Sequence, residues 1–167
     1  LIAVVCLIFN SCTTDIEVNT PALQATIDGK LFRPTVKKAI FNDDGSLVIS
    51  GNTDIQSISF STSSTKVGTY KIGKQTINKV SFETNNSKFL SDDVISEGEI
   101  NITEIYNNQI SGNFYFKNLK DNSGNTMSFN NGWFYRIPIE NAVEDDSTNA
   151  SQNTTTCLLN ASLTAKI

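Results

Sequence analysis

Apolar and polar residues alternate along much of this chain, and this alternation constrains its fold more than any other feature. Within residues 110–116, Ile, Gly, Phe and Phe occupy every second position, and Ser, Asn and Tyr occupy the positions between them. A period of two places the apolar side chains on one face of an extended strand. No stretch carries the long 3.6-residue apolar repeat of an amphipathic helix. The pattern therefore predicts half-buried β-strands.

Short turn signals separate these stretches at intervals of about 8–12 residues, as in small all-β domains. Asp28-Gly29 is a typical two-residue hairpin turn, which would place Ala25 opposite Phe32. Residues 85–98 form the longest break between strands. Asn, Ser and Thr supply 56 of the 167 residues, and these short polar side chains favour strands and turns over helices. We therefore expect one all-β domain over residues 22–139, a single antiparallel β-sandwich or barrel-like meander of about nine or ten strands.

The first twelve residues indicate where the protein resides. Residues 1–9 are an unbroken apolar run, too short for a membrane span of about 20 residues. Such a run matches the centre of a secretory signal peptide, here residues 1–11 without the cationic leader. Asn10-Ser11-Cys12 follows at once, and a cysteine preceded by a small residue at this place resembles a bacterial lipoprotein signal, so residues 12–21 are predicted to be a lipidated cysteine and its tether. The alternative is an ordinary signal peptide with an incidental cysteine.

The residue types that the chain lacks exclude several classes of site. It has no histidine, which excludes Ser-His-Asp and Cys-His nucleophile systems and zinc sites built on imidazole. Cys6 would leave with the signal peptide and Cys12 would carry lipid, so Cys157 remains alone and no intrachain disulfide is expected. A net charge of −4 with only 13 basic residues makes nucleic acid a poor partner. We expect no metal and no cofactor.

Five short motifs occur in order along the chain and carry a family resemblance. They are Ala25-Thr26-Ile27-Asp28-Gly29-Lys30, Gly68-Thr69-Tyr70, Ile100-Asn101-Ile102-Thr103, Ile110-Ser111-Gly112-Asn113-Phe114-Tyr115-Phe116 and Asn131-Gly132-Trp133-Phe134. With these motifs and its lipoprotein-like start, the chain resembles a family of uncharacterised β-rich lipoproteins of Bacteroidota over residues 22–139. The resemblance implies an antiparallel β fold and a cell-envelope location, and it implies no catalytic residue.

The C-terminal part of the chain has a different composition. Residues 140–156 are rich in Asn, Ser, Thr and acidic residues, which indicates a flexible polar segment. Within it, Ser147 lies in an Asp-Ser-Thr triplet that resembles the O-glycosylation acceptor of Bacteroidota envelope proteins. Residues 157–167 contain the pattern of one more strand. They either close the β domain or begin a truncated continuation.

Three pairs of adjacent carboxylates in predicted turns are candidates for acid–base catalysis. They are Asp43-Asp44, Asp92-Asp93 and Asp145-Asp146. Glycosidases need two carboxylates that face each other across a cleft, whereas neighbours in a loop point apart and stay solvated. Asp121–Asn125 places oxygen-bearing side chains at alternate positions, as calcium loops do, but its glycine is at the fourth position rather than the sixth. A hairpin turn explains this segment, and we expect no catalysis.

Aromatic residues near Asn131-Gly132 are the best candidates for binding. An Asn-Gly pair rarely lies within a regular strand, so we expect a bulge or a turn there. This shift would put Phe134 inside and both Trp133 and Tyr135 outside, whereas an unshifted strand would leave Trp133 in the core. Outside, Trp133 and Tyr135 would form a flat apolar platform with polar edges, which Tyr115 extends. Such a platform suits sugar rings or a protein partner.

These features predict a lipid-anchored protein of the cell envelope, in the outer membrane, that binds a glycan or small molecule and is not an enzyme. The alternative is a structural or accessory subunit of an envelope complex, which would present a flat apolar patch or a free sheet edge. The expected partners are the membrane, through the lipid anchor, and a glycan or an envelope protein.

Overall fold

The computed structural model describes residues 20–140, and within this range the chain is all-β. The eleven strands are β1 (Ala22–Ile27), β2 (Lys30–Phe32), β3 (Val36–Phe41), β4 (Leu47–Asn52), β5 (Gln56–Thr62), β6 (Gly68–Gly73), β7 (Lys79–Thr84), β8 (Lys88–Leu90), β9 (Glu97–Tyr106), β10 (Gln109–Lys120) and β11 (Thr126–Glu140). No helix that could cross a membrane occurs among the described residues. The all-β class is confirmed, and the strands number eleven rather than nine or ten.

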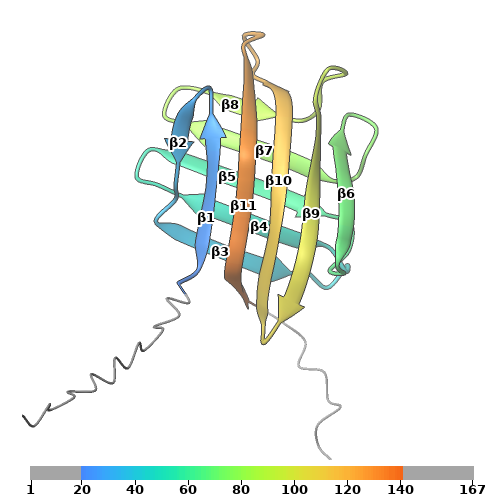
Figure 1. The fold of residues 1–167 in the computed structure, drawn as a ribbon. Helices are drawn as coiled ribbons and strands as arrows, with labels where there is room; N and C mark the ends of the chain where they lie inside the picture. The colour runs from blue at the N-terminus through green and yellow to red at the C-terminus, as the bar shows by residue number, and fades with distance from the viewer. Residues whose placement is uncertain (1–19, 141–167) are drawn as a thin grey trace, which may run out of the picture.

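All eleven strands belong to one hydrogen-bonded sheet that folds over on itself into two layers (Figure 1). The front layer in Figure 1 contains β1, β11, β10, β9 and β6, and the back layer contains β3, β4, β5, β7 and β8. Strands of the back layer run crosswise to those in front. Two junctions connect the layers, because β11 pairs with β3 and β8 pairs with β10.

One junction departs from the antiparallel pattern that we expected. The described pairings are antiparallel except that of β11 with β3, which is parallel. The cause is the length of β11, whose earlier residues pair with β1. Its last residues, Ile139 and Glu140, extend past the start of β1 and lie opposite Ala39 and Ile40.

The additional strand is β8, which lies within the predicted break at residues 85–98. Its three residues pair with β7, where Phe89 lies opposite Phe82, and with β10, where Leu90 lies opposite Lys120. A strand this short carries too little alternation to be recognised from the sequence.

The first hairpin has the predicted geometry. Asp28 and Gly29 adopt φ angles of 46° and 80°, the left-handed pair that a two-residue hairpin turn requires. Ala25 lies opposite Phe32, as expected from this loop length. The turn chemistry therefore fixes the register of β1 against β2.

Phenylalanine rings from both layers meet in the space between them. The ring centroid of Phe60, in the back layer, lies 4.9 Å from that of Phe114 and 5.6 Å from that of Phe116, both in β10. It also lies 6.0 Å from the centroid of Phe134 in β11. All four side chains are at most 3% exposed. Burial of one such side chain contributes about 1.5–3 kcal/mol, so this cluster holds the two layers together.

Bulges in β11 decide which of its aromatic residues face the core. Asn131 and Arg136 adopt φ angles of 50° and 48°, and each lies where the register between β10 and β11 shifts. Without a shift, residues five positions apart would point to opposite faces of a strand. Phe129 and Phe134 are five apart, yet both are buried. The predicted bulge at Asn131-Gly132 is therefore confirmed.

Gly132 of β11 packs closely against Phe114 of β10. A Cβ atom added there would be 2.5 Å from Cε2 of Phe114 and 2.6 Å from the Phe114 carbonyl oxygen. Because Phe114 is packed among the core rings, it cannot move aside without disturbing them.

Gly132→Ala is expected to lower the free energy of unfolding by about 1–3 kcal/mol, because the added methyl group overpacks the core. Urea unfolding followed by circular dichroism measures this change. Gly73→Ala is the matched control, since its added Cβ would come no closer than 3.3 Å to a neighbouring atom. Equal stability of the two variants would contradict the prediction.

Candidate functional site

The outer face of the front layer carries the three aromatic residues that the sequence singled out. Trp133 is half-buried and Tyr135 is 39% exposed, while Phe134 between them is buried in the core. Tyr115 is half-buried and alternates with two buried phenylalanines of β10. Alternate residues of a strand point to opposite faces, so all three rings lie on the outer side. The outward orientation is confirmed, and Trp133 is not a core residue.

The strand register places these aromatic residues along one diagonal of the face. Trp133 lies opposite Asn113 of β10, and Tyr115 is two residues further along β10. Diagonal neighbours of this kind are about 7–8 Å apart, within reach of aromatic side chains. Tyr135 is two residues beyond Trp133 in β11 and lies opposite Ala22 of β1.

A cation lies over each of the two tyrosine rings. Lys117 Nζ is 5.5 Å from the ring centroid of Tyr115, and Arg136 Cζ is 5.2 Å from that of Tyr135. Glu97 accepts a hydrogen bond from Lys117 at 3.0 Å, which raises the pKa of Lys117 and keeps it charged. Within residues 20–140 no such cation lies over Trp133, so a ligand would displace no cation from the face of the indole.

A shallow hollow of about 480 Å³ lies beside Trp133; its lining residues are Asn113, Phe114, Tyr115, Lys117, Asn130, Asn131 and Gly132. The bulge at Asn131 shifts the register of β11 against β10 at this point. The hollow therefore combines amide groups with aromatic surface.

An uncharged row of side chains crosses the same face. The register places Trp133 between Gln24 of β1 and Asn113 of β10. Asn113 in turn lies opposite Asn101 of β9, which lies opposite Thr69 of β6. Alternation within each strand predicts that these residues point outward, but the register between distant strands is not visible in the sequence. The row is therefore a feature that only the structure reveals.

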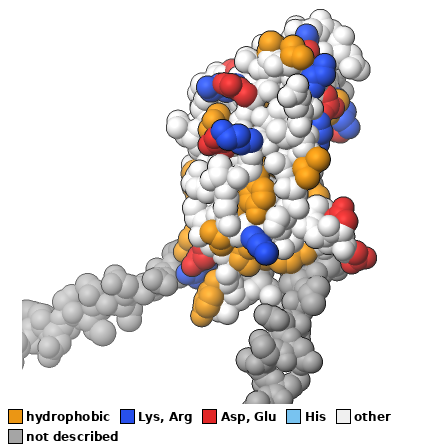
Figure 2. All heavy atoms as spheres, turned by 90° about the vertical axis from the view of Figure 1, so that its right-hand side faces the viewer, with side chains coloured by type: hydrophobic (Ala, Val, Ile, Leu, Met, Phe, Trp, Pro, Cys, Tyr) orange, Lys and Arg blue, Asp and Glu red, His pale blue; other side chains and the backbone are white. Residues whose placement is uncertain are grey.

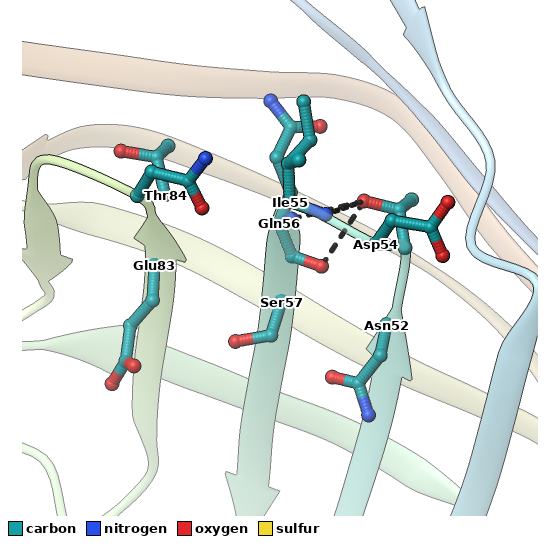
Figure 3. A pocket seen from close by; sticks show the side chains of 9 residues that line it. Asn52, Asp54, Ile55, Gln56, Ser57, Glu83 and Thr84 are labelled. Atoms are coloured by element: carbon teal, nitrogen blue, oxygen red, sulfur yellow. Dashed lines mark hydrogen bonds between the residues drawn. The ribbon is translucent and has the colours of Figure 1, made fainter.

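A second hollow lies at the turn between β4 and β5, beside the end of β7 (Figure 3). Two carboxylates line it, Asp54 and Glu83, and Figure 3 shows their side chains pointing apart. Glu83 forms an ion pair with Lys88 at 2.6 Å. Thr53 Oγ1 accepts a hydrogen bond from the Gln56 backbone N–H at 2.9 Å and so organises the turn. This hollow is a feature of the turns rather than an acid–base site.

The adjacent carboxylates Asp92 and Asp93 bind different partners. Asp92 forms an ion pair with Lys79, and Asp93 forms one with Lys120, both at 2.9 Å. The hydrogen bond from Lys120 lowers the pKa of Asp93. In the part of the chain that the structure describes, no group of three acidic or cysteine side chains is positioned to hold a metal ion.

Opposite charges are balanced over the described domain. Residues 20–140 contain 12 Lys and Arg residues and 12 Asp and Glu residues, which leaves no net charge. Figure 2, viewed from the side of β6, shows both signs interspersed among polar and hydrophobic side chains. This face therefore presents no field of a single sign that would attract a polyanion.

Asp121 closes the turn between β10 and β11, the segment that the sequence compares with a calcium loop. Its carboxylate accepts hydrogen bonds from the backbone N–H groups of Ser123 and Asn125 and from Asn125 Nδ2, at 2.8–2.9 Å. These donors, the Asn125 side chain foremost, lower the pKa of Asp121. The carboxylate thus has its partners within the turn, as the hairpin interpretation expected.

Asp121→Asn is expected to lower Tm at pH 7 and to make Tm less sensitive to acidification. An Asp whose pKa is lower in the folded state stabilises the fold above the unfolded value of about 3.9. That stabilisation is lost as the pH falls through the folded pKa, so the variant should lose less Tm than the unsubstituted protein on acidification. Asp54→Asn is the control, because Asp54 is an exposed carboxylate in the turn between β4 and β5. Parallel Tm–pH curves for the Asp121 variant and the unsubstituted protein would contradict the prediction.

Several predictions concern residues outside the described range. They are the signal peptide over residues 1–11, lipid attachment at Cys12, the polar segment up to residue 156, O-glycosylation at Ser147, and a closing strand or continuation over residues 157–167.

Comparison with known proteins gives one family match. Residues 19–138 match a family model described as a domain of unknown function (DUF6252). This match covers nearly the same stretch as the resemblance carried by the five sequence motifs. Searches of curated proteins and of solved structures find no match to the chain.

Proposed function

Since this chain belongs to the DUF6252 family, whose description assigns no activity, we propose a function from its own sequence and surface. We propose that it is a lipid-anchored cell-envelope protein of the outer membrane. Its β domain is a non-catalytic binding module for a glycan or small molecule. The outer face of the front layer, centred on Trp133, is the binding site.

The observation that carries this proposal is the outward-facing, half-buried indole ring of Trp133 within an uncharged polar surface. Small-molecule sites combine aromatic surface with a few polar groups that fix the orientation of the ligand. A sugar ring presents C–H groups on its faces and hydroxyl groups around its rim. The indole of Trp133 would stack on such a face, and the amides of Gln24 and Asn113 would bind the rim.

The charged groups at the border of this face support binding rather than catalysis. Glu97 forms an ion pair with Lys117 at 3.0 Å, and Glu99 forms one with Lys71 at 3.5 Å. Both carboxylates are thus engaged by ammonium groups, whereas glycosidic cleavage needs a carboxylic acid free to protonate the leaving oxygen.

The layout of the domain is compatible with a membrane tether. The start of β1 and the end of β11 lie at the same end of the domain in Figure 1. A tether from Cys12 would approach the domain from that end. The lateral face that carries Trp133 would then be open to ligands in the envelope.

Cys12→Ser is expected to move the protein from the membrane fraction to the soluble fraction, because it removes the proposed lipid attachment. Fractionation of bacteria that express the full chain, with labelling by a fatty acid, measures both location and lipidation. Cys6→Ser is the matched control, since this cysteine is also near the N-terminus but would leave with the signal peptide. A Cys12→Ser protein that stays in the membrane would refute the anchoring proposal.

Trp133→Ala is expected to weaken glycan binding at least about tenfold, because central aromatic anchors commonly contribute more than about 1.4 kcal/mol to binding. Calorimetric titration of the full chain with a panel of neutral and anionic polysaccharides measures the affinities. Ser59→Ala, in the outer face of the back layer, is the control variant. Unchanged affinity in the Trp133 variant would exclude this face as the site.

A second candidate function is that of an accessory subunit in an envelope complex, and one observation favours it. Ile77 and Val94 are 78% and 74% exposed, in the loops after β6 and β8, and Val94 lies against residues 73–76. Exposed apolar side chains on neighbouring loops can form a protein-contact surface. Recovery of a partner that leaves Trp133 emission unchanged would favour this function.

A further inference from the structure

We infer that the ligand of this face is an uncharged glycan chain that lies across the strands, along the row Gln24, Trp133, Asn113, Asn101 and Thr69. This inference rests on the proposed binding function and specifies the class and direction of the ligand.

The direction follows from the register. The row crosses β1, β11, β10, β9 and β6, which are neighbours in the sheet. Adjacent strands are about 4.8 Å apart, so the row extends over about 19 Å. A single sugar ring cannot contact both ends of such a row, whereas an oligosaccharide of several units can. Asn113 is the middle residue of the row, and with its neighbour Trp133 it would hold one sugar unit.

The chemistry of the row matches hydroxyl groups. Amide side chains offer both donors and acceptors, as sugar hydroxyls do. Thr69 Oγ1 donates a hydrogen bond to Asn101 Oδ1 at 3.2 Å, which fixes the orientation of the Asn101 amide. Its Nδ2 group is then directed away from Thr69, in position to donate to a ligand. Asn113 is exposed between Asn101 and Trp133 and can contact the same chain.

The charges around the row favour a neutral ligand over an anionic or a cationic one. On one side, Glu99 and Glu97 form ion pairs with Lys71 and Lys117. On the other side, Glu104 lies opposite Ser111 of β10, and Arg136 lies over the ring of Tyr135. The opposite charges balance on each side, so a charged chain would gain little attraction and would lose hydration.

The tyrosines explain why the chain should lie across the strands rather than along the aromatic diagonal. Lys117 and Arg136 occupy positions over Tyr115 and Tyr135. A ligand that followed the diagonal would have to displace both cations from these rings. A ligand that follows the row meets only Trp133 and uncharged groups.

The test measures affinity as a function of oligosaccharide length. The probes are neutral β-linked oligosaccharides of one to six units, in glucose, mannose and N-acetylglucosamine series, with a uronic acid series for comparison. The full chain with Cys12→Ser is titrated, and Trp133 emission and calorimetry report binding. Affinity is expected to rise with length until the row is covered, and the uronic acid series is expected to bind at least about tenfold more weakly.

Asn101→Ala separates this inference from the proposed function. It is expected to weaken binding of the longest neutral oligomer by about five- to tenfold, and that of the shortest binding oligomer by less than about twofold, as the loss of one distal hydrogen bond predicts. Asn52→Ala, an exposed amide in the outer face of the back layer, is the matched control and should bind like the unsubstituted protein. Urea unfolding verifies that both variants fold.

The outcomes distinguish the two proposals. If Trp133→Ala abolishes binding but Asn101→Ala affects all lengths equally or none, the site stands and the direction across the strands is wrong. If the uronic acid series binds more tightly than the neutral series, the inference of a neutral ligand is wrong, although the site stands. If no oligosaccharide binds and Trp133 emission never changes, both the glycan-binding function and this inference fail.

Discussion

The structure depends on the contact between Phe60 of the back layer and the aromatic rings of the front layer. Among residues 20–140, backbone strand pairing joins the two layers only at short junctions, where Leu90 meets Lys120 and where the end of β11 meets β3. The remaining cohesion between the layers must come from buried side chains. Phe60, with three ring centroids between 4.9 and 6.0 Å from its own, is the centre of that packing. Because the rings fill the inner side, the residues that alternate with them are available on the outer side.

The bulge at Asn131 connects this core to the candidate site. It shifts the alternation of inward and outward side chains in β11 by one residue. Phe129 and Phe134 can therefore both face inward while Trp133 faces outward. The same bulge lies at the hollow on the outer face, whose lining includes Asn130 and Asn131. One local irregularity thus serves both the packing of the interior and the shape of the exterior, as is common for bulges near functional surfaces.

The sequence predicts the features that depend on local chemistry. The alternation in residues 110–116 identifies β10, Asp28-Gly29 identifies the first hairpin, and Asn131-Gly132 identifies the bulge. Features that depend on pairing between segments far apart in the sequence cannot be predicted from local chemistry. The short β8 exists because β7 and β10 offer it hydrogen bonds, and the parallel pairing at Ile139 exists because β11 extends past β1. The uncharged row across five strands likewise requires the register between strands, which no single segment specifies.

The charge balance of the described domain has a consequence for how copies of this protein behave near one another. Residues 20–140 carry equal numbers of acidic and basic side chains, so the net charge of −4 comes entirely from the flanking segments, in Asp15, Glu17, Glu144, Asp145, Asp146 and Lys166. Copies of a domain with no net charge repel one another only weakly, and this weak repulsion favours self-association. The flanking carboxylates therefore supply the long-range repulsion between copies. Colloidal stability at high local density is a property of the flanks, whereas the fold and the candidate site are properties of the domain.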